Sequence, residues 1–441
     1  MALSSASSLS SPGKFGKNAF FFVIVTVFID MMAFAVIMPS MPFLMSELTG
    51  LPIEDVVPWG GYITVVYAIM NFITQPILGN LSDRFGRRPI LLISMGTLAI
   101  DFLIMGFAHS IWLLFLGRFL SGLSGATHST AAAYIADTTE PENRAKAFGM
   151  LGAAFGLGFI LGPVIGGLLG QIDPRAPFFA AAGLAGLNFL YGMFVLPESL
   201  DREHRRPFDW KRANAFGAFK HFSKIPHLAW FIVAMGFYGF AHWVYPATFS
   251  YFGPIKFGWD AQMTGLALGA VGVGSALVQG GLIGPAMKTF GATRLVFFGF
   301  IVTAVTFVCY AIATESWMIF AIIPLGALAG LIGPAMNQIM TARVARNAQG
   351  ELQGALASVQ ALGNVFSPVL MTQTLFYFTH SAAPVYFPGA AFALAAVITA
   401  LAIFPLIKGL QSTPKIADPA IDGPGLVEAP AAAETAAVAT P

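Results

Sequence analysis

The residues with the clearest chemical potential form a short charged string between two apolar stretches. It reads Gly79-Asn-Leu-Ser-Asp83-Arg84-Phe-Gly86-Arg87-Arg88-Pro89, with one acid, three arginines and glycines that permit a tight turn. An acid at a helix end and arginines one turn later can form ion pairs that lock two helices in one conformation and release them in another. A basic loop that only fixes orientation is the alternative. The residues expected to act in such a gate are Gly79, Asp83, Gly86, Arg87, Arg88 and, from the end of a later apolar stretch, Asp137.

Three charged residues, Asp30, Asp101 and Arg118, lie inside long apolar stretches. An ionisable side chain in hydrocarbon costs at least about 2.5 kcal/mol, so each is a functional candidate. With a rise of about 1.5 Å per residue, Asp101 and Arg118 lie roughly 12 Å and roughly 10 Å below the same end of adjacent antiparallel helices. With Asp30 at similar depth, the three are expected to form one buried cluster in which an acid exchanging partners with Arg118 loads and releases a proton. A purely structural ion pair is the alternative.

A third pattern is a run of small residues spaced G-x8-G-x3-G-P-x2-G-G. Small residues let membrane helices approach closely, and a proline bends the helix that contains it. Taken singly, such residues serve packing. The run consists of Gly149, Gly158, Gly162, Pro163, Gly166 and Gly167.

The second half of the chain has amides and aromatic rings, but no acid, inside its apolar stretches. Amides can hydrogen-bond a polar substrate on which aromatic rings stack, or they can join one helix to another. The single Cys309 excludes an intrachain disulfide, and no cluster with metal-ligand spacing or cofactor motif is present in the sequence. The candidate substrate contacts are His242, Trp243, Gln279, Asn337, Gln338 and Gln353.

The elements that must position these residues follow from composition. The chain has 441 residues, of which 56% are hydrophobic and only 10% charged, too few polar residues to cover a water-soluble globule. A membrane-spanning helix needs roughly 20 apolar residues. No cleavable signal is expected, because the Ser-rich start runs directly into a full-length apolar segment. The predicted all-α membrane protein has twelve spans, near 18–40, 61–80, 90–109, 111–137, 148–170, 178–196, 228–251, 263–286, 294–313, 317–341, 354–378 and 388–407.

The positions of the 23 Lys and Arg support this map. Basic residues in short loops concentrate on the cytoplasmic side of a membrane. On the predicted map only Arg175 and Lys256 fall on the opposite side, and Arg118 lies within a span. Both termini are therefore expected in the cytoplasm. The net charge of +2 gives no indication of nucleic-acid binding.

The two halves of the chain are related. A shift of 205 residues pairs Gly79 with Gly284, Gly86 with Gly291, Gly125 with Gly330 and Pro163 with Pro368 without a gap. Such a parallel repeat predicts two six-helix bundles with a substrate site between them. The predicted parts are a cytoplasmic N-terminus (1–17), a first bundle (18–197), a cytoplasmic linker (198–227), a second bundle (228–408) and a disordered tail (409–441).

The charged string resembles the conserved loop of the major facilitator superfamily, and the glycine run resembles the antiporter motif of its proton-coupled drug exporters. Further strings resemble the tetracycline/proton antiporters of that superfamily: Gly117-Arg118, Ala133-Tyr134-Ile135-Ala136-Asp137, Ala176-Pro177-Phe178-Phe179, Leu196-Pro197-Glu198-Ser199 and Leu352-Gln353-Gly354. The resemblance covers about residues 20 to 410. It departs at Thr303 and Ser275, where the family typically has an acid and often a histidine.

The resemblance implies a major facilitator fold and proton-driven export of a small organic compound, with tetracycline or a related drug as the expected substrate. It implies gating by Asp83 and Arg87, and proton coupling by Arg118 with the membrane acids Asp30 and Asp101. The expected setting is the inner membrane of a bacterium, with a small-molecule substrate, protons and lipid as partners, no cofactor, and a monomer as the working unit. The alternatives are a proton-linked transporter of a sugar or other metabolite and, more remotely, a membrane enzyme or receptor on the same fold.

Overall fold

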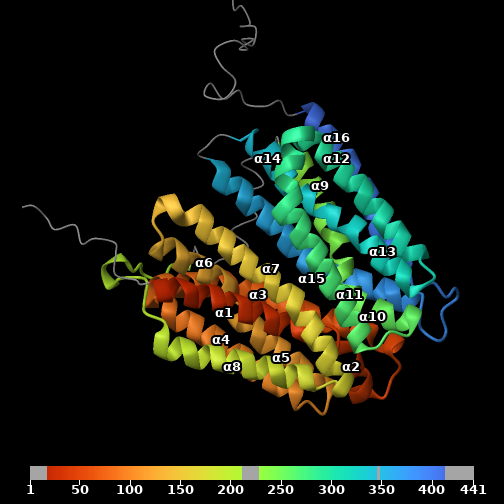
Figure 1. The fold of residues 1–441 in the computed structure, drawn as a ribbon, viewed down its shortest axis with the longest axis horizontal. Helices are drawn as coiled ribbons and strands as arrows, with labels where there is room; N and C mark the ends of the chain where they lie inside the picture. Colours follow the sequence, from red (N-terminus) through yellow and green to blue (C-terminus); the bar gives the residue numbers. More distant parts are fainter. Residues whose placement is uncertain (1–16, 211–227, 345–347, 413–441) are drawn as a thin grey trace, which may run out of the picture.

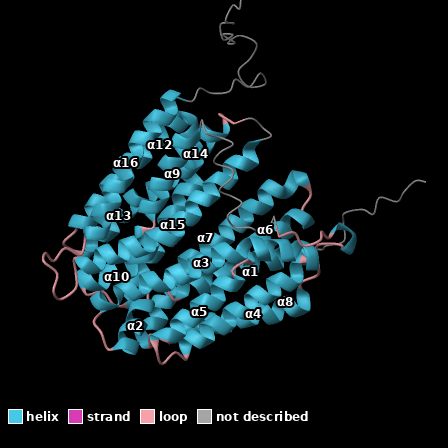
Figure 2. Ribbon diagram, turned by 180° about the vertical axis from the view of Figure 1, so that it is seen from behind, coloured by secondary structure: helices cyan, strands magenta, loops and turns pink. Residues whose placement is uncertain are grey.

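The computed structural model describes residues 17–210, 228–344 and 348–412, and within these ranges the chain is helical, with no β-strand (Figures 1 and 2). A helix satisfies its own backbone hydrogen bonds, as a segment in lipid must. The first half contains α1 (Lys17–Val36), α2 (Met41–Thr49), α3 (Ile53–Phe85), α4 (Arg87–Gly106), α5 (Ile111–Ser124), α6 (Thr127–Thr138), α7 (Arg144–Ile172) and α8 (Ala176–Val195). The second half contains α9 (Ala229–His242), α10 (Val244–Phe257), α11 (Ala261–Leu277), α12 (Ile283–Ile312), α13 (Ser316–Ala327), α14 (Ile332–Thr341), α15 (Gln349–Tyr377) and α16 (Ala390–Ser412).

Eight helical segments of the described chain are long and apolar enough to cross a membrane, or nine if the bent pair α1 and α2 counts as one span. One of the eight, Ala261–Ile312, has 52 residues and contains predicted spans eight and nine. It is about twice as long as a bilayer requires, and Gly291, with φ 72° and ψ 158°, interrupts it. The predicted all-helical membrane fold is confirmed. The count differs from twelve for two reasons. Helix breaks divide some predicted spans, and the long helical segment Ala261–Ile312 contains two others.

Four helix breaks lie at positions that the repeat relates, and three of them fall inside predicted spans. The turn at 37–40 separates α1 from α2, and Trp243, 205 residues after Met38, separates α9 from α10. The break between α5 and α6 falls at Gly125, and its counterpart Gly330 lies in the 3-10 turn Leu328–Leu331 between α13 and α14. The predicted spans 111–137, 228–251 and 317–341 are therefore each interrupted, whereas the turn at 37–40 falls at the predicted end of the first span. Interrupted helices in membrane proteins place free backbone groups where they line a cavity or meet another helix.

The helices pack as two bundles, α1 to α8 and α9 to α16 (Figure 1). The helix contacts between bundles join α3 to α15, α7 to α11, and α10 to α2 and α3. Gln373 Nε2 donates to the Tyr62 hydroxyl at 2.9 Å, and the Tyr251 hydroxyl contacts Met45 Sδ at 3.5 Å. These contacts lie toward one end, here called the outer end; the end that carries Gly86 is the inner end. Figure 1 shows the helix ends at α2 and α10 together and those at α6 and α14 apart, so the bundles meet at the outer end.

The seam between α7 and α11 is a backbone contact made possible by glycine. A Cβ added to Gly265 would collide with the Pro163 carbonyl oxygen and with Gly167, and a Cβ on Gly167 would collide with the Ala261 carbonyl oxygen. Close backbone approach is what small residues provide in membranes, where lipid removes most of the hydrophobic drive for association. This seam joins the two bundles along the outer halves of both helices.

The structure also defines the segments between and after the bundles. Helix α16 continues to Ser412, so residues 409–412, predicted as the start of the tail, are helical. Residues 198–210 lie at the inner end of the first bundle. The rest of the predicted linker, 211–227, the rest of the tail, 413–441, and the N-terminus before Lys17 lie outside the described residues.

Replacing Gly265 by leucine should separate α7 from α11. We expect a loss of stability of about 1–3 kcal/mol, typical of overpacking, because the new side chain meets backbone atoms that cannot move aside. Thermal unfolding of the purified protein measures the effect. Gly183→Leu is the matched control, since a Cβ there meets no atom within 4 Å; equal stability of both variants would contradict a tight seam.

Candidate functional site

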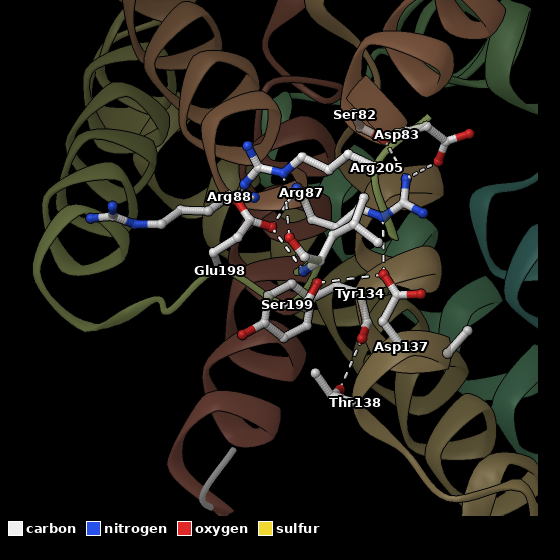
Figure 3. Close-up of polar contacts among 12 residues, drawn as sticks. Ser82, Asp83, Arg87, Arg88, Tyr134, Asp137, Thr138, Glu198, Ser199 and Arg205 are labelled. Atoms are coloured by element: carbon white, nitrogen blue, oxygen red, sulfur yellow. Dashed lines mark hydrogen bonds and ion pairs between the residues drawn. The ribbon is translucent and has the colours of Figure 1, made fainter. Parts of the chain in front are cut away.

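At the inner end of the first bundle, Arg87 joins three helices (Figure 3). Its Nη1 atom donates to Asp83 Oδ1 and to Ser82 Oγ, each at 2.6 Å, and its Nε atom donates to Asp137 Oδ2 at 3.0 Å. Asp83 and Ser82 end α3, Arg87 begins α4, and Asp137 lies near the end of α6. The structure therefore brings together the three residues expected to form a lock, and all three belong to the same bundle.

The glycines of the charged string have different structural roles. Gly86, with φ 109°, is the single residue between α3 and α4, a conformation that favours glycine. Gly79 lies inside α3, so the prediction of a turn at this residue is wrong. Arg88 points away from Arg87 and its Nη2 atom donates to the Met193 carbonyl at the end of α8 at 2.7 Å. The string is thus mostly helix, with its chain reversal concentrated at Gly86.

Glu198 is a functional candidate to which the sequence interpretation gave no role beyond its place in a family string at the start of the linker. Its carboxylate accepts hydrogen bonds from the backbone N–H groups of Arg87 at 2.7 Å and Arg88 at 3.3 Å, and from that of Leu200 at 3.1 Å. An anion at a helix N-terminus satisfies free N–H groups and interacts favourably with the helix dipole. A Cβ on Gly86 would occupy the position of this carboxylate. An acid directly after an apolar span, opposite a basic loop, is the sequence signal for this role.

The segment after Glu198 follows the same surface. The Arg206 N–H donates to the Asp83 carbonyl at 3.1 Å. The Asn80 side chain donates to the Asp209 carbonyl at 2.7 Å and accepts from the Asp209 N–H at 3.4 Å. Residues 198–209 therefore attach the start of the linker to the end of α3 and the start of α4, where Arg87 makes its ion pairs.

Asp101 on α4 and Arg118 on α5 form a buried pair within the first bundle. Asp101 Oδ2 lies 3.4 Å from Arg118 Nη2, and the side chains are 0% and 5% exposed. The contact with Arg118 is an ion pair without hydrogen-bond geometry, and the Ser121 side chain lies close to the Asp101 carboxylate. The guanidinium also contacts Met105 Sδ at 3.4 Å and lies 5.7 Å from the centre of the Phe102 ring. A carboxylate held this weakly can exchange partners at a lower cost than one with full hydrogen bonding.

Asp30 on α1 lies near this pair without joining it. It is half-buried, close to Thr127 at the start of α6, and no ion pair joins it to Arg118 among the described residues. Tyr67 on α3 interacts electrostatically with Asp30, Asp101 and Arg118. The predicted cluster is thus an ion pair and a separate acid, with a tyrosine near both. The sequence interpretation missed Tyr67 because a tyrosine in an apolar span looks like packing.

The glycine run of α7 is a packing surface on two sides. Gly158, Gly162 and Gly166 face the backbone of α1, where an added Cβ would meet atoms of Phe28, Met32 and Val36, and Gly167 faces α11. Ser40, in the turn that breaks α1 from α2, donates to the Gly166 carbonyl at 3.3 Å. Pro163 lies inside a continuous α7, and Gly149 meets no atom within 4 Å. The run therefore holds α7 between its own bundle and the other one, beside the break in the first span.

The six candidate substrate contacts do not converge on one place. Trp243 Nε1 donates to Asn364 Oδ1 at 2.7 Å, which joins the break between α9 and α10 to α15. Gln353 Nε2 donates to Asn337 Oδ1 at 3.0 Å, which joins α15 to α14. Gln338 lines a cavity of about 410 Å³ at the inner end, and Gln279 lies in the π-helical turn before α12. For the two bonded pairs, the alternative of helix-to-helix hydrogen bonding describes the structure.

His242 differs from the other five candidates. It ends α9 at the break in the span, its ring lies 5.3 Å from that of Tyr238 and 5.2 Å from that of Tyr245, and its Nδ1 atom is buried without a hydrogen-bond partner in the described structure. Of the two residues that depart from the family pattern, Thr303 is buried on α12 and donates to the Gly299 carbonyl at 2.7 Å. Ser275 lies on α11.

Removal of the Glu198 carboxylate should weaken the start of α4. For Glu198→Ala we expect a loss of about 1 kcal/mol, the usual cost of losing a helix cap, and a smaller loss for Glu198→Gln, which keeps an acceptor. Thermal unfolding of the purified protein is the measurement, with exposed Glu203→Gln as the control. Since the Cβ of Gly86→Ala meets Glu198, that substitution should cost less when combined with Glu198→Ala; strict additivity would contradict the contact.

Comparison with known proteins agrees with this architecture. Solved structures with the same fold include a bacterial homolog of the human lysosomal transporter Spinster, inward-facing and unoccupied, with a TM-score of 0.70 and 17% identity over 90% of this chain and 98% of that one. The human organic anion transporter MFSD10 matches with a TM-score of 0.62 and 20% identity over 88% and 99% of the two chains.

Sequence relatives are more similar. The class C tetracycline resistance protein of Escherichia coli is 38% identical over 81% of this chain and 89% of its own length, and the class B protein of the same species is 36% identical over 79% and 86%. The family model of the Major Facilitator Superfamily matches residues 23–368 and 255–431. The chain is therefore a membrane transporter, not an enzyme, and belongs to the major facilitator superfamily together with the tetracycline resistance proteins.

Proposed function

We propose that this protein is a proton-coupled efflux antiporter that exports a small organic compound, tetracycline or a related drug, by alternating access. The observation that carries the proposal is the buried ion pair of Asp101 and Arg118, with Asp30 nearby, in a chain similar to tetracycline resistance proteins over most of its length. Buried charge inside a membrane bundle is retained for function far more often than for stability.

The geometry suggests how proton binding and helix movement are linked. Asp101 and Arg118 lie on neighbouring helices of one bundle, and the Asp101 carboxylate has the Arg118 guanidinium as its ion-pair partner. When α4 and α5 shift, the carboxylate loses its compensating charge and binds a proton; when the pair re-forms, it releases the proton. Release and uptake of the proton on opposite sides of the membrane then require that the first bundle moves as a whole between the state with the pair formed and the state with the pair broken.

The two ends of the molecule provide the complementary gates. In this conformer the bundles meet through α2, α3, α7, α10, α11 and α15 at the outer end. At the inner end, Arg87, Asp83 and Asp137 are paired within the first bundle. We assign these three residues to the inner gate, because closure there must bring the ends of α3 and α4 against the second bundle. The proposed setting is a bacterial inner membrane with both termini in the cytoplasm.

Arg118→Ala should abolish gradient-driven accumulation, because it leaves Asp101 buried without a compensating charge. The expected loss of stability is about 3–5 kcal/mol, as for a broken buried ion pair. Asp101→Asn and Asp30→Asn should fold and yet fail to couple. Substrate uptake and proton movement in everted vesicles are the two readouts, with exposed Glu142→Gln as the control. If the two neutralised acids supported normal proton-linked accumulation, the coupling assignment would fail.

Expression of the protein in drug-sensitive bacteria should raise their tolerance to tetracycline, and an uncoupler should abolish the efflux. The Asp101→Asn variant, which should fold and yet fail to couple, controls for expression of a membrane protein when it is expressed to the same level. Unchanged tolerance would remove tetracycline as the substrate. A panel of other drugs, sugars and metabolites in the vesicle assay, with proton movement recorded, would then identify the compound class.

A further inference from the structure

The two basic residues that lie on the outer side of the membrane share an unusual set of partners. Arg175 and Lys256 are the exceptions to the basic inner side that the predicted span map otherwise shows. Lys and Arg are disfavoured in outer loops, because basic residues in short loops stay on the cytoplasmic side when a membrane protein inserts. Each of them makes hydrogen bonds to backbone carbonyl groups at the C-terminal end of a membrane helix.

Arg175 lies in the turn before α8. Its Nη1 atom donates to the carbonyl oxygens of Gly106 at 3.1 Å and Ala108 at 2.5 Å, at the end of α4, and its Nη2 atom forms an ion pair at 3.0 Å with Glu47 on α2. The last carbonyls of a helix have no partner within the helix and carry the negative end of its dipole, so a cation stabilises them. Arg175 therefore fastens α2 to the end of α4.

Lys256 does the same in the second bundle. It lies on α10, and its Nζ atom donates to the Ala311 carbonyl at the end of α12 at 2.8 Å. The ammonium also lies over the rings of Phe252 and Phe257, at 5.2 and 5.7 Å from their centres. These contacts fasten α10 to the end of α12.

The repeat relates the two arrangements although the cations come from different parts of the chain. Ala311 follows Gly106 by 205 residues, the shift that superimposes the two halves. The fastened helices α2 and α10 follow the related breaks at 37–40 and Trp243, and each ends at a glycine with positive φ, Gly50 and Gly258. Each bundle thus ties the outer segment of a broken span to the end of a neighbouring helix, the first bundle with an arginine and the second with a lysine.

We propose that Arg175 and Lys256 are positioning residues of the outer gate, each holding the outer segment of a broken span against its own bundle. This matters because α2 and α10 contact each other across the bundle boundary through Met45 and Tyr251. A segment behind a helix break can follow either bundle unless it is fastened to one. With the two cations in place, each segment moves with its own bundle and the gate opens or closes as a unit.

This inference rests on the proposed alternating access, and its test measures the gate directly. Thr372 on α15 is 1% exposed and lies against Gly61 of α3 at the boundary between bundles. In a chain with Cys309→Ala, a Thr372→Cys reporter should react with a membrane-impermeant thiol reagent in intact cells only when the outer gate opens. Labelling is recorded without substrate and without a proton gradient, so it measures gate opening and not transport. A failure of the efflux proposal therefore differs from a failure of this inference.

Arg175→Ala and Lys256→Ala should each raise the labelling rate of the reporter about fivefold, the scale of losing a helix-end cation, and should reduce transport. Arg175→Lys and Lys256→Arg keep the cation and should restore slow labelling. Exposed Lys288→Ala, at the inner end, is the control. Labelling is compared at equal amounts of inserted protein with equal unfolding temperatures. Unchanged labelling in both alanine variants, or fast labelling that the conservative variants do not reverse, would overturn the proposal.

Discussion

The interior of a lipid bilayer offers no hydrogen-bond partner, and most of the features described above follow from that constraint. Helices keep their backbone groups satisfied along their length but leave four N–H groups at one end and four carbonyls at the other. This chain supplies the missing partners with charged side chains placed at helix ends. Glu198 accepts from the N-terminus of α4, and Arg175 donates to the carbonyls at the C-terminal end of the same helix. Both ends of α4 are therefore fixed by side chains from outside it.

The same constraint makes Asp101 and Arg118 informative. A carboxylate with no exposed surface, paired with a guanidinium at 3.4 Å without hydrogen-bond geometry, is an expensive arrangement for a structural purpose alone. It lies on α4, the helix whose two ends are fixed. The two attachments hold α4 at both ends, and its ion pair with Arg118 links it to the neighbouring α5.

Glycine determines where the two bundles can slide against each other. At the seam of α7 and α11 backbone atoms meet directly, so the contact has few side chains to repack when the bundles rotate. The seam lies beside the turn at 37–40, where Ser40 contacts Gly166. A backbone contact next to a helix break suits the proposed rocking of the bundles. The attachment of α2 and α10 to their own bundles would make each segment move with its bundle.

The sequence determined the features that depend on local composition. The length of the apolar stretches predicted the helical membrane fold, and the repeat predicted the two bundles. The positions of Asp83, Arg87 and Asp137 predicted three side chains that do contact one another. Family membership followed from the same strings, and the comparisons confirmed it. These features are readable because hydrophobicity and helical spacing act over a few neighbouring residues.

Tertiary structure decided what depends on residues far apart in the chain. Glu198 meets Arg87 across 111 positions and caps α4, and Trp243 meets Asn364 across 121 positions and joins α15 to the break between α9 and α10. The breaks in three predicted spans were missed because an apolar stretch has the same composition whether its helix is continuous or interrupted. The roles of Arg175 and Lys256 were equally hidden, since the carbonyl groups that they bind leave no signature in the sequence.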